Sequence, residues 1–245
     1  FYHGRRRAII GQKMPFYFQD FYKFVDNQYR RRILINEYNA LGNLIASTFV
    51  VDNNNTNWPN FNLFFDVFGS FAINADTSVV EMKVGTDLTG SPGPPTGYKT
   101  QIYYFDIQDT CNTDPYVVHW LNRLGAYDSG LFNAKNTKGY TVQRKQFNSN
   151  EVRNPYATSD FYKTNFSNRY DGTLVLNTGW ISEAEAEWLE EIITSPALLL
   201  EKDSVFSSVV CVDSTFEHKV SQKGERLLNM TINLEYSQPN FSQVL

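Results

Sequence analysis

Apolar and polar residues alternate along several short segments of the chain, which is the pattern of β-strands. Residues 116–121 carry large or apolar side chains at both alternating sets of positions, so they predict a strand covered on two faces. A turn follows, and Gly125 is the expected point of reversal because glycine tolerates left-handed backbone angles. Residues 127–132 then run back as the second strand of the hairpin. The stretch 116–132 therefore predicts a tight hairpin within the central sheet.

A different pattern, with apolar residues three and four positions apart, predicts one principal helix near 182–195. Ser182 and Glu185 have the spacing of a capping box at its start, and Ser195 followed by Pro196 ends it. The predicted buried stripe consists of Trp188, Leu189, Ile192 and Ile193. This helix is expected to pack on a sheet.

Strand patterns occupy much of the remaining chain. The predicted strands are 30–36, 47–51, 79–84, 98–107, 139–147, 173–177, 198–201, 205–212, 215–220 and 226–236. In 139–147 the expected inward residues are Tyr140, Val142 and Phe147, and 148–168 is expected to be a long polar connection. The predicted fold class is mainly β, or β-dominated α+β, with antiparallel sandwich-like sheets and the single principal helix.

A proline- and glycine-rich segment, 85–97, is the clearest break in the chain. It holds three prolines and four glycines, a composition that cannot sustain a strand ladder. We therefore predict two regions. Residues 1–90 form an N-terminal aromatic-rich arm and β region, and residues 98–245 form a C-terminal β domain with a packed helix.

Two clusters near the N-terminus are candidate interaction surfaces. The aromatic cluster consists of Phe16, Tyr17, Phe18, Phe21, Tyr22 and Phe24, and the basic cluster consists of Arg30, Arg31 and Arg32. Such a density of rings is typical of a segment laid across a hydrophobic surface of its own domain or of a neighbour. A second basic run, residues 5–7, is interpreted, like Arg30–Arg32, as a solvated or subunit-facing charge run; contact with phosphates or an acidic partner is the alternative.

Overall composition narrows the class of protein. The 245 residues are 16% aromatic and carry a net charge of -4, which argues against general nucleic-acid binding. No apolar run approaches the ~20 residues of a membrane-spanning helix, and no signal-peptide pattern is present. Cys111 and Cys211 are too few for a disulfide framework, so two reduced, buried thiols are expected, with a pairing across two strands as the alternative. The chain starts at Phe1 without Met and is expected to be a processed product or part of a longer polypeptide.

The sequence contains no recognisable catalytic or metal-binding pattern. Its histidines, at 3, 119 and 218, have no metal-site spacing with one another or with the cysteines, and no nucleophile elbow occurs around Ser129. His119 lies within a strand, where a packed or hydrogen-bonded neutral imidazole is expected. We predict no enzymatic activity and no cofactor. The alternatives are a carbohydrate-binding β-sandwich module, suggested by the aromatic content, and a glycosidase whose carboxylates would be Asp106 and Asp109, or Asp160 and Asp171.

Three stretches carry a resemblance to a known family. They are WLNRLGAYDSGLF, GWISEAEAEWLEEIITSP and VVCVDSTFEHKVSQKGERLLNMTINLEYS. They resemble virion proteins of tailed phages and prophages of Bacteroides-like bacteria, over roughly residues 104–238. The matching structural positions are Trp120, Asn122, Gly125, Asp128, Ser182, Glu185 and Trp188.

The resemblance implies a structural function. It implies a tail, baseplate or ring component of a virion, made in the host cytoplasm, that acts through oligomeric assembly. Its partners would be other copies of itself and neighbouring virion proteins. The family supplies no catalytic residue, and the resemblance leaves open which component this is and what symmetry a ring would have.

Overall fold

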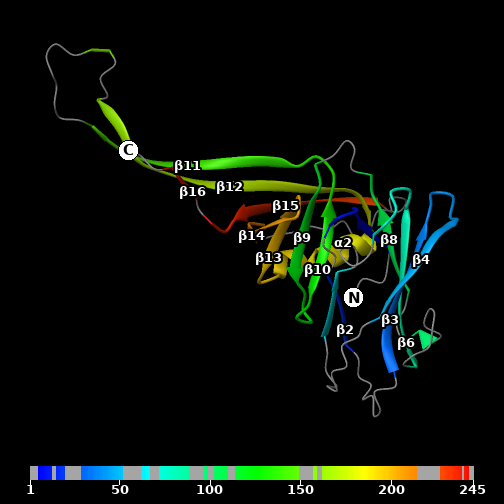
Figure 1. Cartoon of the computed structure of the whole chain (residues 1–245). Coiled ribbons are helices and arrows are strands. Elements are labelled where there is room, and N and C mark those ends of the chain that lie inside the picture. The colour runs from blue at the N-terminus through cyan, green and yellow to red at the C-terminus, as the bar shows by residue number, and fades with distance from the viewer. Residues whose placement is uncertain are drawn as a thin grey trace.

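The chain folds into two main β-sheets and a short helical segment (Figure 1). The computed structural model describes residues 5–12, 15–19, 29–51, 62–66, 72–88, 97–98, 102–109, 114–148, 157–158, 162–213, 227–238 and 240–242. Within this part of the chain strands predominate and the larger sheet is antiparallel, which confirms the predicted mainly β, sandwich-like fold class.

The larger sheet has eight strands and contains the predicted hairpin. Across the sheet the order is β10 (Tyr127–Phe132), β9 (Tyr116–Leu121), β13 (Leu198–Lys202), β14 (Val205–Cys211), β15 (Leu227–Tyr236), β12 (Lys163–Ser182) and β11 (Thr137–Asn148), while β16 (Asn240–Ser242) also pairs with β12. Every strand pair in it is antiparallel. The predicted strand 215–220 lies outside the described residues.

The smaller sheet has six strands, and all of them lie within residues 6–107. Its order is β1 (Arg6–Ala8), β8 (Tyr103–Ile107), β6 (Val79–Leu88), β3 (Tyr29–Tyr38) and β4 (Leu44–Val51), with β7 (Gly97–Tyr98) paired to β6. Strands β1 and β8 are parallel, whereas the other pairs are antiparallel. β8 therefore belongs to the smaller sheet, although the prediction from the sequence assigned it to the C-terminal region, residues 98–245. The proline- and glycine-rich segment 85–97 interrupts the strands, but it does not determine which sheet the next strand joins.

The hairpin formed by β9 and β10 has the predicted geometry. Five of the six residues of β9 are buried, so the strand is covered on both faces as its sequence indicated. Gly125 has a φ of +80°, in the left-handed region that glycine adopts without strain. The turn closes with Leu121 opposite Tyr127.

The predicted helix appears as two short pieces, α2 (Glu183–Leu189) and α3 (Glu191–Thr194). The Ser182 side chain caps α2 by accepting a hydrogen bond from the Glu185 backbone N–H at 3.2 Å, as predicted. Ser195, in an extended conformation, ends α3. Among the described residues, no helix has the length and apolar character needed to cross a bilayer.

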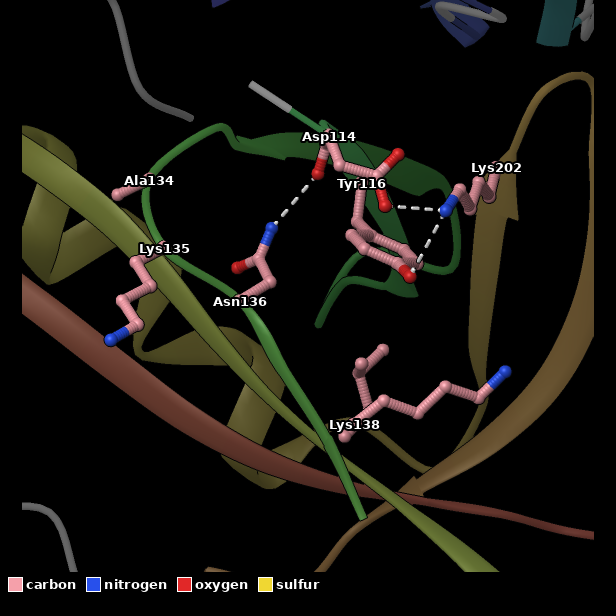
Figure 2. Close-up of a pocket in the computed structure, with 8 residues that line it drawn as sticks. Asp114, Tyr116, Ala134, Lys135, Asn136, Lys138 and Lys202 are labelled. Carbon is pink, nitrogen blue, oxygen red and sulfur yellow. Dashed lines mark hydrogen bonds and ion pairs between the residues drawn. The ribbon is translucent and has the colours of Figure 1, made fainter. Parts of the chain in front are cut away.

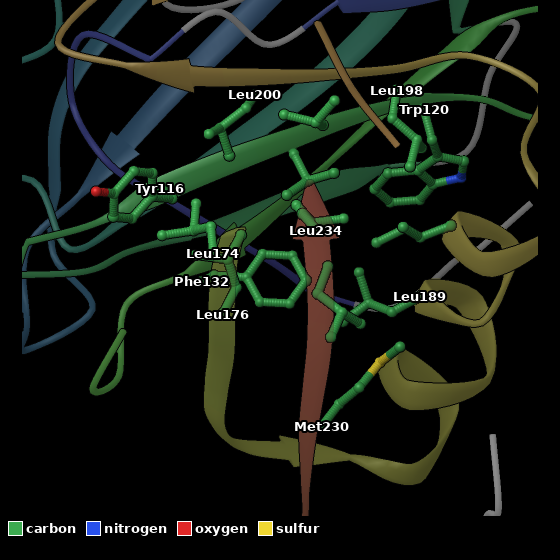
Figure 3. Packing of buried hydrophobic residues seen from close by; sticks show 14 of the residues in the cluster. Tyr116, Trp120, Phe132, Leu174, Leu176, Leu189, Leu198, Leu200, Met230 and Leu234 are labelled. Carbon is green, nitrogen blue, oxygen red and sulfur yellow. The ribbon is translucent and has the colours of Figure 1, made fainter. Parts of the chain in front are cut away.

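The main hydrophobic core lies between one face of the larger sheet and the helices (Figure 3). Trp120 from β9, Leu176 from β12 and Leu189 from α2 are each no more than 1% exposed. The members labelled in Figure 3 are Tyr116, Trp120, Phe132, Leu174, Leu176, Leu189, Leu198, Leu200, Met230 and Leu234. The helical stripe predicted from the sequence is therefore packed on the sheet.

Strand β12 is much longer than the predicted strand 173–177, since it runs for 20 residues. Its outer part pairs with β11, and together they form a hairpin that projects from the body of the molecule (Figure 1). We call residues 137–148 of β11 and 163–172 of β12 the projecting hairpin. The prediction of a polar connection over 148–168 is thus wrong for its last residues, which continue the ladder instead.

Three β11 residues that the sequence predicts to lie inward are exposed instead. Tyr140, Val142 and Phe147 are 57%, 41% and 50% exposed. Tyr140 and Val142 alternate as on a buried strand face, but no other layer of the described chain covers the hairpin there. An alternating pattern identifies the face of a strand without identifying what covers it.

Candidate functional site

The residues of the N-terminal aromatic cluster lie partly outside the described chain. Phe16, Tyr17 and Phe18 belong to β2 (Pro15–Gln19), which pairs with β5 (Asn62–Asp66) and lies near β10 of the same protomer. Arg30, Arg31 and Arg32 belong to β3 and pair with β6. For these six residues the structure describes the backbone alone, and Phe21, Tyr22 and Phe24 fall outside the described residues. Their interface role remains a prediction.

Three of the structural positions predicted from the sequence, Asn122, Asp128 and Trp188, come together around the Asp128 carboxylate. Its Oδ2 accepts hydrogen bonds from Asn122 Nδ2 at 3.0 Å and from Trp188 Nε1 at 3.3 Å. Its Oδ1 lies 3.4 Å from Arg6 Nη1. All four residues are buried. Since a buried carboxylate is stable only when it is paired and hydrogen-bonded, this set of donors explains how Asp128 is accommodated.

Asn122 also shapes the hairpin that carries Asp128. Its Oδ1 accepts hydrogen bonds from the backbone N–H groups of Leu124 and Ala126, both at 3.0 Å. The Gly125 N–H donates to the Asn122 carbonyl at 3.0 Å. Asn122 therefore fixes the turn and at the same time donates to Asp128, which is a physical reason for the Asn, Gly and Asp spacing.

Two tryptophans complete this cluster. Trp120 and Trp188 have ring centroids 4.8 Å apart, and the Arg6 guanidinium lies 4.9 Å from the centre of the Trp188 ring. A Cβ atom added at Gly130 would lie 2.6 Å from Leu189 and 3.1 Å from Trp120. Glycine at 130 thus permits the close approach of helix α2 to the β9–β10 hairpin.

Arg7 makes a second connection, to the start of α2. Its Nε lies 2.8 Å from Glu185 Oε1, and its Nη atoms donate to the carbonyls of Thr178 and Leu131 at 2.7 and 3.0 Å. Burial raises the pKa of Glu185 above its usual value, while the Arg7 charge opposes that shift without cancelling it. We refer to Arg6, Arg7, Asp128, Glu185 and Trp188 together as the arginine clamp.

The arginine clamp corrects the interpretation of residues 5–7. Arg5, with a side chain 60% exposed, fits a solvated charge paired to Asp106. Arg6 and Arg7 instead face acidic residues of their own chain and fasten β1, a strand of the smaller sheet, to the larger sheet. A run of three arginines indicates charge, but its partners lie more than 100 positions away in the sequence and no local pattern identifies them.

A buried chain of hydrogen bonds crosses β10, β9 and β13. Ser129 Oγ lies 2.8 Å from His119 Nδ1, and His119 Nε2 lies 2.8 Å from Glu201 Oε2. In serine hydrolases the nucleophile faces Nε2 and the acid faces Nδ1, so the connectivity here is reversed. Ser129 is also only 2% exposed. The arrangement favours a polar contact that ties three strands together, and it confirms the expected hydrogen-bonded, buried His119.

Two of the carboxylates considered for glycoside hydrolysis are engaged by arginines. Asp106 pairs with Arg5 at 3.0 Å, and Asp171 pairs with Arg169 at 3.2 Å. Asp160 lies outside the described residues. Within the described part of the chain, no group of three or more His, Cys, Asp or Glu side chains is arranged to hold a metal ion. Cys211 is a free, half-buried thiol whose pKa is raised by burial, and Cys111 lies outside the described residues.

A cavity of about 580 Å³ lies where the projecting hairpin joins the body (Figure 2). Its lining includes Lys135, Lys138 and Lys202. Lys202 bonds Asp114 at 2.5 Å and the Tyr116 hydroxyl at 3.3 Å, and the Asp114 contact is the main reason that its pKa is raised. The excess of lysine over aspartate gives this cavity a positive lining suited to an anionic group.

The projecting hairpin carries two pairs of contacting aromatic side chains. Cross-strand pairing places Tyr140 opposite Gly172 and Val142 opposite Tyr170, and these residues continue the face of β12 that buries Leu174 in the core. The rings of Tyr140 and Tyr170 are 5.8 Å apart on this face. Phe147 lies seven positions after Tyr140, so alternation places it on the opposite face, where its ring is 6.3 Å from that of Phe166. The core-facing side of the sheet therefore extends outward as an uncovered aromatic face.

Comparisons with known protein families, with curated proteins and with solved structures found no match for this chain.

Proposed function

We propose that the protein is a structural, non-catalytic subunit of a phage virion, a tail, baseplate or ring component that acts through oligomeric assembly. The observation that carries this proposal is the uncovered aromatic face of the projecting hairpin. Tyr140 and Val142 are 57% and 41% exposed on that face, and Phe147 and Phe166 are 50% and 53% exposed farther along the hairpin. The sequence resemblance to virion proteins is the reason for proposing a virion as the assembly.

The free energy that exposed aromatic rings would gain on burial supports this proposal. Burial of a phenylalanine side chain stabilises a structure by roughly 1.5–3 kcal/mol, so a set of exposed rings is a substantial unused source of free energy. Contiguous exposed apolar residues on a soluble protein usually mark an interaction site. A subunit that covers this face with a neighbouring copy gains that free energy upon assembly.

The strand edges of the molecule support the same proposal. β11 is the last strand on its side of the larger sheet, and β4 is the last strand on one side of the smaller sheet. β4 has the sequence LIASTFVV, which contains no charged residue or proline to discourage pairing with another chain. Leu44 and Phe49 on this edge are exposed. In Figure 1 the two edges lie at opposite ends of the molecule, as head-to-tail assembly requires.

A direct test is the mass of the full chain in solution across a concentration series, by light scattering and sedimentation, with negative-stain imaging of the largest species. We expect rings, tubes or other defined oligomers in the wild-type protein. The variant Phe147→Ser with Phe166→Ser should remain monomeric with an unchanged melting temperature. A wild-type chain that stays monomeric at every concentration would contradict the proposal.

The second candidate function is carbohydrate binding, because exposed rings in one protomer are what a sugar platform would need. Two of the four rings of the hairpin are phenylalanines, and the Tyr140 and Tyr170 rings meet edge to face at 74°, so they offer no flat coplanar surface. Binding of the monomeric protein to immobilised glycans, lost in Tyr140→Ala but retained in the exposed-residue control Leu124→Ala, would favour this function over assembly.

A further inference from the structure

The cavity at the base of the projecting hairpin lies where four strands of the larger sheet meet. Lys138 comes from β11, Tyr116 from β9, Leu174 from β12 and Lys202 from β13. The volume of about 580 Å³ falls in the range of roughly 300–1,000 Å³ that is typical of pockets for small molecules. All of these residues belong to one copy of the chain, so binding here does not depend on assembly.

The charged side chains around this cavity do not balance. Lys135, Lys138 and Lys202 line it together with one aspartate, Asp114, which leaves a net charge of +2. The whole chain has a net charge of -4, so the lining is opposite in sign to the protein that contains it. Charge of one sign gathered in a concave site attracts ligands of the other sign. The cavity is therefore suited to a ligand that carries about two negative charges.

Lys202 and Tyr116 supply hydrogen-bond donors to the cavity. The Lys202 ammonium group donates to Asp114 Oδ2 at 2.5 Å and to the Tyr116 hydroxyl oxygen at 3.3 Å. An ammonium group has three N–H donors, so one remains for a ligand, and the Tyr116 hydroxyl has a proton of its own to donate. Because Tyr116 is only 6% exposed, the surrounding core fixes the position of this hydroxyl.

Lys138 lines the same cavity and contacts aromatic side chains. Its Nζ lies 5.7 Å from the ring centres of both Tyr140 and Tyr236. None of the ion pairs between described residues includes Lys138. The pKa of Lys138 is raised mainly by hydrogen bonding to the Tyr140 side chain, and the Tyr236 and Tyr116 hydroxyls add to this shift. This amine is therefore charged at neutral pH, with no described carboxylate to balance it.

The arrangement of the lysines favours a phosphate group over a carboxylate. Figure 2 shows the amines of Lys138 and Lys202 on the same side of the cavity as the Tyr116 hydroxyl, whereas the Lys135 amine points away from them. Lysine binds phosphate as a point charge, while the planar fork of arginine is the more specific partner of a carboxylate, and the described residues that line the cavity include no arginine. A phosphate monoester carries a charge of about -1.5 to -2 at neutral pH, which matches the charge of the lining.

We propose that this cavity binds a small organic phosphate monoester, with the phosphate group held by Lys138, Lys202 and the Tyr116 hydroxyl. The organic part of the ligand occupies the rest of the cavity, beside Ala134 and Leu174. Because Lys138 belongs to β11 and Lys202 to β13, the bound phosphate also joins the projecting hairpin to the body of the molecule.

Calorimetric titration of the full chain with phenyl phosphate and with inorganic phosphate tests this site. We expect phenyl phosphate to bind about tenfold more tightly than inorganic phosphate, because its ring is buried in the cavity. Lys138→Ala and Lys202→Ala should each raise the Kd about tenfold, the effect of losing a hydrogen bond to a charged group, and Lys138→Arg should retain most of the affinity. Lys145→Ala, at an exposed lysine on the opposite face of β11, is the matched control and should leave the Kd unchanged.

The pH dependence of binding tests the phosphate assignment independently of mutation. The second ionisation of a phosphate monoester has a pKa of about 6, so the affinity for phenyl phosphate should rise between about pH 5 and pH 7.5. Inorganic sulfate is a dianion throughout this range and should bind with a constant Kd. An affinity for phenyl phosphate that does not change with pH would contradict binding of the dianion.

The results for this site are independent of the proposed function, which is tested by the mass of the assembled protein. If phenyl phosphate does not bind, or if Lys138→Ala and Lys202→Ala bind it as the wild-type chain does, the phosphate site is overturned. An equal loss of affinity in Lys138→Ala and Lys145→Ala would also overturn it, because the attraction would then come from the overall charge of the hairpin. If inorganic phosphate binds as tightly as phenyl phosphate, the assignment of an organic ester is overturned.

Discussion

The arginine clamp and the projecting hairpin are built from the same kinds of side chain, yet one is covered and the other is not. In the clamp, Arg6 lies 4.9 Å from the Trp188 ring and next to a carboxylate, all within one protomer. On the hairpin, Arg144 lies on the same face as Tyr140 and Tyr170, and Tyr140 is 57% exposed. The clamp residues therefore stabilise the fold of one protomer, whereas the exposed hairpin side chains contribute little to it; we propose that they contact another copy of the chain.

The largest expected loss of stability comes from a substitution in the arginine clamp. Trp188→Ala should lower the free energy of unfolding by about 4 kcal/mol, because it leaves a cavity beside Trp120 and removes a donor from buried Asp128. Trp188→Phe keeps most of the volume and should cost about 1 kcal/mol. Denaturant titration of dilute, monomeric protein measures both. Equal losses for the two variants would contradict the packing role of the ring.

The second-largest expected loss of stability comes from substitution of Arg6, a cation of the arginine clamp. Arg6→Met should cost about 3 kcal/mol, since it leaves the buried Asp128 carboxylate without its charged partner. Arg5→Met is the matched control at an adjacent, exposed arginine and should change stability by less than about 0.5 kcal/mol. The same denaturant titration compares them, and a similar cost at both positions would mean that Arg6 is not held by burial and pairing.

A smaller effect should appear as a dependence of the free energy of unfolding on pH. Because burial raises the pKa of Glu185, the folded protein binds that proton more tightly than the unfolded chain does. This contribution to stability is present at low pH and is lost as the pH rises from the ordinary value of 4.5 through the raised pKa of the folded state. Glu185→Gln should remove that decline, while Glu187→Gln, on the exposed side of α2, should retain it. Unfolding free energies measured from pH 4 to pH 8 give the comparison.

The smallest effect on stability should come from the hairpin rings. Phe147→Ser with Phe166→Ser should change the free energy of unfolding of the monomer by no more than about 0.5 kcal/mol, because these rings are already half exposed. The same variant should lose self-association. A large loss of monomer stability would show that the rings contribute to the fold of one protomer, and the contrast with the clamp would fail.

The sequence predicted those features that depend on local chemistry. Gly125 marks the turn, Ser182 caps the helix, and the apolar stripe around Trp188 packs on the sheet, because each depends on residues a few positions apart. Asp128 is marked only by the resemblance to virion proteins, in which an Asn and an Asp at this spacing belong to a hairpin.

The features that sequence reasoning missed depend on distant partners. Arg6 and Asp128 are 122 positions apart, and no periodicity connects them. Tyr140 and Val142 have the alternation of a buried strand face, but whether a layer covers that face is decided by the whole fold. The same alternation occurs in a core strand and in an exposed strand.

Hydrogen exchange by mass spectrometry, at concentrations below and above self-association, tests the central claim most directly. Backbone amides of β9 and of the inner part of β12, around Trp120 and Leu176, should be protected at both concentrations. Amides of 137–148 should exchange rapidly in the dilute protein and become protected in the concentrated protein. Protection of 137–148 in the dilute monomer, or rapid exchange there in assembled protein, would contradict the account.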